Sequence, residues 1–337
     1  MSVKQQVLDC LEKNRGIVVS GQELAEKLGV SRNSIWRAVK SLREEGYRID
    51  SGTNRGYVFS DENDILSEEG IRLYLPKSAS GIELHVFDEI DSTNNEAKRM
   101  LAAGFSGTAA IVANCQTGGR GRRGRSFYSP KGGGVYVTLI LQNESTTSDA
   151  VLITMAAALA TVHAIEKSCS DKPKIKWVND VYVEDKKVSG ILTEGISDLE
   201  TGSIQSVVVG IGVNVGKQEF PPELAEKAGY VSLKPGFTRN MLVAAMIGNL
   251  LELNTLSDQK QSSQESGETG ERKSGKQSLL DQYRSYSLVF GREVEFELEG
   301  KKRRSRAIDI DETGGLIVED DSGERLVLHG GEVSIAL

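Results

Sequence analysis

The order of helix and strand signals in the first sixty residues is the feature that most narrows the possible folds. Residues 3–14 place valines and leucines on one helical stripe, and Ser20 and Ser31 provide N-cap signals for two further helices. Two short β-like runs then surround a Gly/Asn turn and end near Phe59. Three helices followed by a hairpin predict a winged helix-turn-helix over residues 1–62, hereafter the head.

The charge of the chain is unevenly distributed between the head and the remainder. Residues 1–60 contain ten Lys and Arg against seven Asp and Glu, a net charge of +3, whereas the complete chain has −7. A basic head on an acidic body indicates that only the head meets a polyanion such as DNA. A second interpretation stays open, in which the winged helix contacts another protein or has lost DNA binding.

The residues expected to contact DNA lie early in the third helix, which would be the recognition helix, and in the hairpin. They are Arg32, Asn33, Ser34, Arg37, Arg48 and Arg55. Trp36 and Val39 are expected to face the core of the head instead. Because one such module reads only half of a two-fold operator, DNA binding also implies a homodimer.

Strand-like and helix-like runs alternate through residues 63–288, hereafter the core domain. Runs such as 206–215 are β-like, whereas 150–167 and 238–253 have the length and composition of buried helices. Several strand pairs are separated by hairpin-length links. The pattern therefore predicts a mixed α/β domain with a largely antiparallel sheet, and an α+β fold class for the complete chain.

Two segments near the C-terminus differ in composition from the rest. Residues 255–278 contain a single Leu and no aromatic residue, which predicts a disordered insertion within the core domain. From Gly291 onward short strand runs alternate with glycine turns, which predicts a small β-barrel over residues 289–337, hereafter the C-terminal domain. This unit is too small to be expected to fold alone.

Cysteine usage and hydropathy indicate the cellular setting. Three scattered cysteines, with no C-x-x-C pair, argue against a disulfide framework or a zinc site and fit a reducing compartment. The N-terminus lacks the apolar stretch of a signal peptide. The longest apolar run, around residues 153–165, is too short to span a bilayer. A soluble cytoplasmic protein without a membrane partner is expected.

Residues 118–125 have the sequence GGRGRRGR and form what we call the cationic loop. Its glycines formally match a dinucleotide-binding fingerprint, but the following SFYSPKGGG cannot begin the helix that the fingerprint requires. Four arginines within six positions repel one another, so an anionic ligand is expected to order the loop. Arginine forks suit a carboxylate or an α-phosphate. The alternatives are a solvated loop or a nonspecific RNA-binding segment.

Five motifs together make the chain resemble the biotin–protein ligases, specifically the bifunctional form that is also the biotin operon repressor. They are DSTN (91–94), QTGGRGRRGR (116–125), KWVND (176–180), KVSGIL (187–192) and GIGVN (210–214). The resemblance covers almost the whole chain. It implies a core domain like that of class II aminoacyl-tRNA synthetases and an SH3-like C-terminal barrel.

The resemblance also implies an activity. The family activates biotin with ATP to biotinyl-5′-AMP, with Mg²⁺ as cofactor, and transfers biotin to a specific lysine of the biotin carboxyl carrier protein of acetyl-CoA carboxylase. Biotinyl-5′-AMP then serves as corepressor when a homodimer binds the operator of biotin synthesis and uptake genes. The chain shows no G-x-S-x-G or Cys–His pattern, so no covalent enzyme nucleophile is expected.

The resemblance assigns roles to individual residues. Biotin binding falls to Ser92, Thr93, Asn94, Gln116, Arg120, Gly121, Arg122 and Lys187. Nucleotide binding falls to Arg122, Phe127, Lys176, Asn179 and Asn214. Ser92 or Thr93 also fits an ordinary helix N-cap, and the two roles are compatible.

Three residues are expected to act in catalysis. Arg122 and Lys187 match positions at the carboxyl and phosphate ends of the adenylate. Asp180 is expected to hold Mg²⁺ or to help deprotonate the incoming carrier lysine, whose ordinary pKa is about 10.4. A carboxylate at the end of a strand is also a common turn former.

The sequence departs from the family pattern at two places. Position 178 is Val where the family usually has Pro, and Ser126, Phe127 and Tyr128 stand where it tends to have a Trp.

Three other functions compete with this interpretation. They are a ligase that no longer represses, a transcription factor that merely senses a small acid, and a lipoate ligase. Arg122 and Lys187 argue against the second, and the cationic loop argues against the third.

Overall fold

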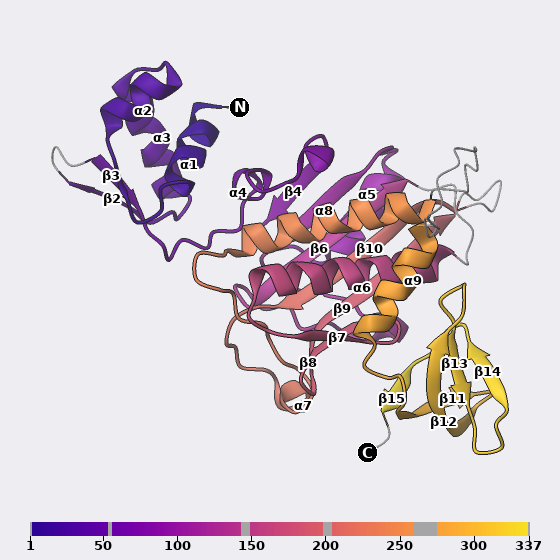
Figure 1. Ribbon diagram of the computed structural model, residues 1–337. Coiled ribbons are helices and arrows are strands. Elements are labelled where there is room, and N and C mark those ends of the chain that lie inside the picture. The colour runs from indigo at the N-terminus through magenta and orange to yellow at the C-terminus, as the bar shows by residue number, and fades with distance from the viewer. Residues whose placement is uncertain (1, 53–55, 143–148, 198–203, 259–274, 336–337) are drawn as a thin grey trace, which may run out of the picture.

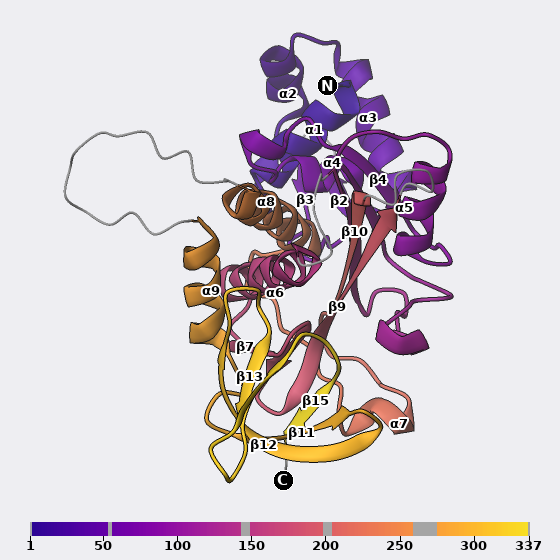
Figure 2. The same ribbon diagram turned by 90° about the vertical axis from the view of Figure 1, so that its right-hand side faces the viewer.

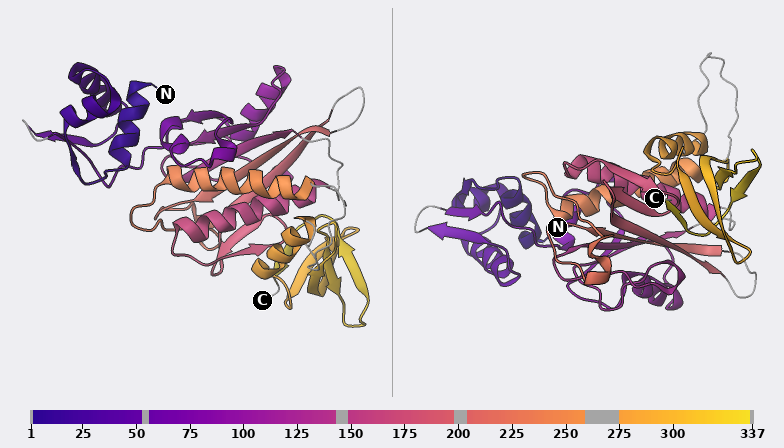
Figure 3. Two further views of the ribbon diagram at one scale, coloured as in Figure 1. Left: turned by 45° about the horizontal axis from the view of Figure 1, so that its top comes forward. Right: turned by 90° about the horizontal axis from the view of Figure 1, so that it is seen from below.

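The computed structural model describes residues 2–52, 56–142, 149–197, 204–258 and 275–335. The head, the core domain and the C-terminal domain follow one another in space as they do along the chain (Figure 1). The head and the C-terminal domain lie at opposite ends of the core domain (Figure 3). Arg55, one of the predicted DNA contacts, lies outside the described residues.

The head is a winged helix-turn-helix, as predicted. Its elements are α1 (Val3–Glu12), β1 (Val18–Val19), α2 (Gly21–Leu28), α3 (Arg32–Glu44), β2 (Ile49–Gly52) and β3 (Gly56–Phe59). The three strands form a sheet in the order β1-β3-β2. Ser20 and Glu23 make both bonds of a capping box, and Gly29 ends α2 in the left-handed conformation, at a φ of 66°.

The position of Trp36 corrects one prediction. The buried stripe of α3 consists of Ile35, Ala38, Val39 and Leu42, at the i, i+3, i+4, i+7 spacing of a helix face. Trp36 lies about 100° around the helix from Ile35, and its side chain is 53% exposed. The prediction that Val39 is buried is confirmed, and the prediction that Trp36 is buried is wrong.

The connection between the head and the core domain is held in place by the start of helix α8 (Arg239–Asp258). Arg239 is 8% exposed and donates to the Asp64 carboxylate at 2.7 Å, to the Asp64 carbonyl at 2.8 Å and to the Asn114 side chain at 2.7 Å. Asn240 accepts from the backbone N–H of Ser67 at 3.1 Å. The connecting segment is therefore bound to the core domain rather than free of it.

A seven-stranded mixed sheet forms the centre of the core domain, in the order β4-β5-β6-β10-β9-β8-β7. In chain order the strands are β4 (Glu83–Phe87), β5 (Ala109–Ala113), β6 (Gly134–Gln142), β7 (Pro173–Lys176), β8 (Asp180–Val183), β9 (Lys186–Ser197) and β10 (Ile204–Asn214). β4 and β5 are parallel, and the other neighbouring pairs are antiparallel. The predicted mixed α/β domain with a largely antiparallel sheet is confirmed.

Helices cover both faces of this sheet (Figure 2). Helices α6 (Asp149–Ser168), α8 (Arg239–Asp258) and α9 (Gly275–Tyr286) pack on one face, and α5 (Thr93–Ala102) packs on the other. Side chains of β5 alternate between the faces, so that Ala110 and Val112 join the large cluster around α6 while Ala109 and Ile111 face α5. Shorter helices are α4 (Glu68–Arg72), η1 (Lys77–Ala79), η2 (Arg122–Gly124) and α7 (Pro222–Ala225).

Helix α6 matches the buried helix predicted over residues 150–167 to within one residue at each end. The window 150–168 extends beyond the apolar run 153–165 and, by length and composition alone, is long and apolar enough to cross a membrane. However, 72% of that window is buried inside the protein, where α6 packs against α8 and the sheet. It is the central core helix of the domain.

The ends of the predicted insertion are helical. Helix α8 continues to Asp258 and α9 begins at Gly275, so residues 255–258 and 275–278 belong to helices rather than to a disordered segment. Residues 259–274 lie outside the described residues.

The C-terminal domain is a small antiparallel β unit, as predicted. Its strands are β11 (Glu293–Leu298), β12 (Lys301–Ile310), β13 (Leu316–Glu319), β14 (Arg325–Leu328) and β15 (Val333–Ile335), in the order β14-β13-β12-β11-β15. Its buried residues Val294, Ala307 and Leu316 join the same apolar cluster as the core domain. Trp177 of the core domain donates its indole N–H to the Gly314 carbonyl at 3.0 Å. The shared apolar cluster agrees with the expectation that so small a unit does not fold alone.

Candidate functional site

A cavity of about 610 Å³ opens between the core sheet, the cationic loop, the segment around α7 and the end of the C-terminal domain. Every residue that the sequence analysis assigned to biotin, nucleotide or catalysis lines this cavity. These residues are Ser92, Thr93, Asn94, Gln116, Arg120, Gly121, Arg122, Phe127, Lys176, Asn179, Asp180, Lys187 and Asn214. Five separate motifs, spread over more than a hundred residues of sequence, therefore meet in one place.

One end of the cavity is a buried polar network around the start of α5. Gln116 Oε1 accepts from the Thr93 backbone N–H at 2.9 Å and from the Thr93 hydroxyl at 3.1 Å. Asn94 donates to Glu194 at 2.8 Å, and its Oδ1 accepts from Thr138 at 2.7 Å. Because these partners fix the side chains in place, the polar groups are preorganised for a small ligand with amide-like donors and acceptors.

Ser92 and Asp91 hold the start of α5. Ser92 is the N-cap, and its hydroxyl accepts from the Asn95 backbone N–H at 3.4 Å. Asp91 pairs with Arg99 at 2.7 Å, and hydrogen bonds from Arg99 hold the pKa of the Asp91 carboxyl well below its ordinary value. The N-cap reading of the DSTN motif is thus correct, and it leaves Thr93 and Asn94 in the cavity wall.

Glycines form part of the cavity floor on β9 and β10. A Cβ on Gly210 would lie 2.1 Å from Asn94 Oδ1, and a Cβ on Gly212 would lie 2.5 Å from the Phe127 ring. Side chains at these two positions would therefore displace both groups. The Phe127 ring also contacts Tyr136 edge-on, with the ring centroids 6.3 Å apart. The glycines of the GIGVN motif are explained by close side-chain approach, not by backbone conformation.

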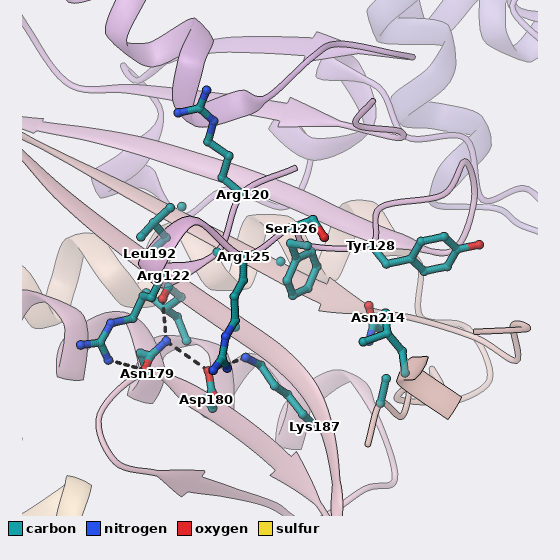
Figure 4. A pocket seen from close by; sticks show the side chains of 18 of the residues that line it. Arg120, Arg122, Arg125, Ser126, Tyr128, Asn179, Asp180, Lys187, Leu192 and Asn214 are labelled. Carbon is teal, nitrogen blue, oxygen red and sulfur yellow. Dashed lines mark hydrogen bonds and ion pairs between the residues drawn. The ribbon is translucent and has the colours of Figure 1, made fainter. Parts of the chain in front are cut away.

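The cationic loop folds as a tight hairpin over the cavity. Phe127 donates its backbone N–H to the Gly119 carbonyl at 2.9 Å, and Gly121 donates to the Arg125 carbonyl at 2.7 Å. Arg123 turns the chain with a φ of 56°, in the left-handed region. Arg122 is half-buried, whereas Arg120 is exposed and points away from the Arg122 group (Figure 4).

A charged cluster lies beneath Arg122. Arg122 donates to Asn179 Oδ1 at 2.8 Å, and Lys187 Nζ lies 2.6 Å from Asp180 Oδ1 (Figure 4). Asn179 is held in turn, because its Nδ2 donates to Asp180 Oδ1 at 3.1 Å and to the Ile191 carbonyl at 2.9 Å. Arg122 of the cationic loop and Lys187 of β9 thus bind two adjacent residues, Asn179 and Asp180, in one part of the cavity wall, where positive charge favours an anionic group.

Lys176 and Asn214 differ in environment from this cluster. Burial lowers the pKa of Lys176 below its ordinary value, although the nearby charge of Asp180 opposes that shift. Its ammonium lies 5.7 Å from the centre of the Tyr182 ring. Asn214 is buried and donates to the Gly229 carbonyl at 2.8 Å, so its amide is tied to the segment that follows β10.

The sequence analysis missed two walls of the cavity. One is the segment around α7, which contributes Phe220, Leu224 and Ala228; two apolar residues beside a Pro-Pro pair in a polar stretch were the available signal. The other is the C-terminal domain, which contributes Glu332 and Ser334. No local pattern distinguishes Glu332, because its place in the site depends on how two domains pack.

The predicted DNA contacts fall into three groups. Arg32, Asn33 and Arg37 are exposed on α3. The Ser34 hydroxyl lies 2.9 Å from the hydroxyl of Ser31, within the N-cap of the helix. Arg48 is exposed and forms an ion pair with Glu62. Two of the predicted cations, Arg32 and Arg37, are thus solvent-exposed on α3.

Comparison with known families defines the class of protein. Residues 86–214 match the biotin/lipoate A/B protein ligase family, residues 289–335 match the biotin protein ligase C-terminal domain, and residues 3–58 match a helix-turn-helix domain. The fold and the site are thus those of a biotin/lipoate-type ligase with a DNA-binding type of head.

Individual relatives narrow this class. The bifunctional ligase/repressor BirA of Bacillus subtilis is 33% identical over 237 residues, which cover 70% of this chain and 72% of that protein. BirA of Escherichia coli is 28% identical over 319 residues, covering 94% of this chain and 92% of that protein. The structure of biotin protein ligase from Aquifex aeolicus in complex with biotin and ATP matches with a TM-score of 0.60 at 27% identity, covering 75% of this chain and 98% of that one. The chain belongs to the bifunctional biotin–protein ligase/repressor family, and it is an enzyme of the biotin–protein ligase class.

Proposed function

We propose that this protein joins biotin to a lysine of the biotin carboxyl carrier protein of acetyl-CoA carboxylase, and that the adenylated vitamin makes it a repressor of biotin genes. The observation that supports the ligase half most directly is the convergence of Arg122 and Lys187 on a cavity whose other end is the Thr93–Asn94–Gln116 network. The same residues would bind an amide-like ring at one end and an anion at the other.

In the first step a carboxylate oxygen of biotin attacks the α-phosphorus of ATP, and the bond to the β-phosphate breaks to release pyrophosphate. Negative charge grows on the phosphate oxygens, and the guanidinium of Arg122 and the ammonium of Lys187 would stabilise it. The hairpin form of the cationic loop would exclude water from the mixed anhydride. Phe220 and Leu224 offer an apolar wall for the adenine end.

In the second step the carrier lysine attacks the carbonyl carbon, the C–N bond forms and AMP leaves. The attacking amine must first lose a proton, and we propose that Asp180, which lines the cavity, accepts it. Asp180 also holds Lys187 at 2.6 Å. We therefore assign Asp180 two tasks, which are to position the lysine in step one and to take a proton in step two.

Mg²⁺ is proposed to enter with ATP. Within the described ranges, no three His, Cys, Asp or Glu side chains gather closely enough to hold a metal alone. A magnesium ion usually takes one or two carboxylates together with substrate phosphates. Asp180 fits that pattern, and the ion would supply charge neutralisation of the phosphates.

The Asp180→Asn variant tests the ligase proposal. With biotin, ATP, Mg²⁺ and a carrier domain, we expect wild type to release pyrophosphate and to label the carrier. In the variant, transfer from preformed adenylate should fall by about a hundredfold, in the range of a lost general base. The initial burst of pyrophosphate should fall less, because an asparagine oxygen can still accept from Lys187 and bind a cation but cannot take a proton. Equal loss of both steps would contradict the role in step two. Labelling with lipoate in place of biotin would favour a lipoate ligase.

The repressor half rests on the basic winged head and on the relatives that are named as repressors. We propose that biotinyl-5′-AMP orders the cationic loop and favours a homodimer, in which two core sheets meet edge to edge and the heads bind an operator in the cytoplasm. Carrier protein would consume the adenylate and oppose dimer formation. Sedimentation with and without the adenylate tests this step, and identical monomer fractions would contradict it.

A further inference from the structure

Trp36 is an exposed indole in the middle of the recognition helix. Its side chain is 53% exposed, whereas the other tryptophan of the chain, Trp177, is 4% exposed. Only three other large apolar side chains of the described residues are exposed to a similar degree, and none of them lies on α3. The core of the head is complete without Trp36, because Ile35, Val39 and their neighbours fill that side of the helix.

The exposed neighbours of Trp36 along the helix are polar or basic. Arg32 and Asn33 lie one turn before it and Lys40 one turn after it, and all three are exposed. The Lys40 ammonium lies 5.7 Å from the centre of the indole ring. Arg37 is the next residue and is also exposed. The apolar indole thus lies among exposed cations, an arrangement that packing of the head's core does not require.

We propose that the Trp36 indole contacts base edges in the major groove of DNA, against the C5-methyl group of a thymine, while Arg32, Arg37 and Lys40 meet the adjoining phosphates. The proposal rests on the repressor half of the proposed function and names a specificity-determining residue for it. The thymine methyl is the apolar group that the major groove displays, so an apolar side chain on a recognition helix has one natural partner there.

The surrounding charge favours DNA over a protein as the occupant of this face. Apolar patches that bind proteins are usually low in charge at their centre. Here the exposed cations Arg32, Arg37 and Lys40 lie within about one helical turn of Trp36, as expected for a helix whose flanks meet phosphates while its centre meets bases. Lys40 can leave the ring for a phosphate without breaking a strong bond, since its pair with Glu44 is exposed and 3.7 Å long.

A selected duplex and its deoxyuridine-substituted versions test the contact between Trp36 and a thymine methyl group. The full-length protein, with biotin, ATP and Mg²⁺, is first used to select a tight duplex from a random 40-base-pair library. Each thymine of that duplex is then replaced in turn by deoxyuridine, which removes only the methyl group. We expect wild type to bind one or two of the substituted duplexes about threefold to tenfold more weakly, which is the effect of losing a buried methyl contact.

The Trp36→Ala variant provides the matched comparison. It should bind the parent duplex more weakly by tenfold or more, bind parent and deoxyuridine duplexes equally, and biotinylate the carrier at the wild-type rate. Because the second tryptophan is buried, acrylamide quenching of wild-type fluorescence reports on Trp36, and duplex binding should protect it.

Different outcomes would contradict the repressor function and the Trp36 contact. Failure of wild type to select any duplex would overturn the repressor function and this contact together. Selection of a duplex whose deoxyuridine sensitivity is the same in Trp36→Ala would overturn the contact alone. Unchanged DNA affinity of the variant with loss of its dimer would assign Trp36 to a protein interface and also contradict the proposal.

Discussion

Arg125 of the cationic loop and Glu332 of the C-terminal domain form a two-point ion pair, although they lie 207 residues apart in the sequence. Each guanidinium nitrogen lies 2.8 Å from one carboxylate oxygen. Burial raises the pKa of Glu332, but the hydrogen bond and charge of Arg125 outweigh it and the pKa falls below its ordinary value. The C-terminal domain therefore holds the loop that closes the site.

The Glu332→Gln change should loosen the loop more than it destabilises the protein. The pair is largely exposed, so its direct contribution to folding is at most about 1 kcal/mol. We expect an unchanged Tm within about 2 °C, but faster dissociation of biotinyl-5′-AMP by up to about fivefold. Stopped-flow dissociation measures this rate. Glu324→Gln, in an exposed turn of the same domain, is the control, and equal dissociation rates in the two variants would contradict the role of Glu332.

The Arg122→Gly change should release the activated intermediate. Arg122 is half-buried and bonded to Asn179, so its removal takes away the loop cation that is fixed beside Asn179 in the cavity wall. We expect the half-life of the bound adenylate to fall by tenfold or more. A tenfold change corresponds to about 1.4 kcal/mol of binding free energy, which is the size of one lost charge-assisted hydrogen bond. Bystander lysines in the mixture should then become biotinylated.

Arg123→Gly is a matched control for that experiment. It removes the same charge from the neighbouring position, and glycine is favoured at the φ of 56° found there. Its adenylate should be retained as in wild type. If Arg123→Gly leaked as much as Arg122→Gly, total loop charge rather than the position of Arg122 would govern retention.

The Arg239→Met change should detach the head from the core domain. Methionine keeps much of the length of the side chain but removes the guanidinium that donates to Asp64 and Asn114, so that only backbone N–H groups still donate to these two side chains. Asp64 is partly exposed and regains water, so we expect a loss of about 2 kcal/mol rather than the larger cost of a fully buried charge. Limited proteolysis near Asp64 should become faster. Arg72→Met, in the exposed pair with Glu68, should change neither stability nor cleavage.

Acid should weaken the pair that holds the start of α5. The pKa of Asp91 is lowered in the folded protein by hydrogen bonds from Arg99, so its contribution to stability is complete above the ordinary pKa of 3.8 and is lost as the pH falls toward the lowered value. The difference in urea midpoint between wild type and Asp91→Asn should therefore be constant from pH 7 to pH 5 and shrink below pH 4. A constant difference down to pH 3 would contradict this assignment.

Local sequence signals predicted the head and the site motifs well. Cap residues such as Ser20 and Gly29 act within one helical turn, so the sequence alone predicts where helices begin and end. The site motifs predicted that Gln116, Arg122 and Lys187 serve one site, and all three line one cavity. The sequence did not predict features that depend on packing between distant elements. Trp36 was placed in the core because it is apolar, but the helix buries a different stripe. Glu332 was missed because only the approach of two domains brings it to the cavity.

We propose that the cationic loop closes over a biotinyl-adenylate held between the Thr93–Gln116 end and the Arg122–Lys187 end of one cavity. Titration calorimetry of the pure protein, first with biotin and then with biotinyl-5′-AMP, measures the binding that this requires. We expect the adenylate to bind at least a hundredfold more tightly than biotin, and Lys187→Met to remove most of that difference while leaving biotin affinity within about threefold. Equal affinities for the two ligands, or no binding of either, would contradict it.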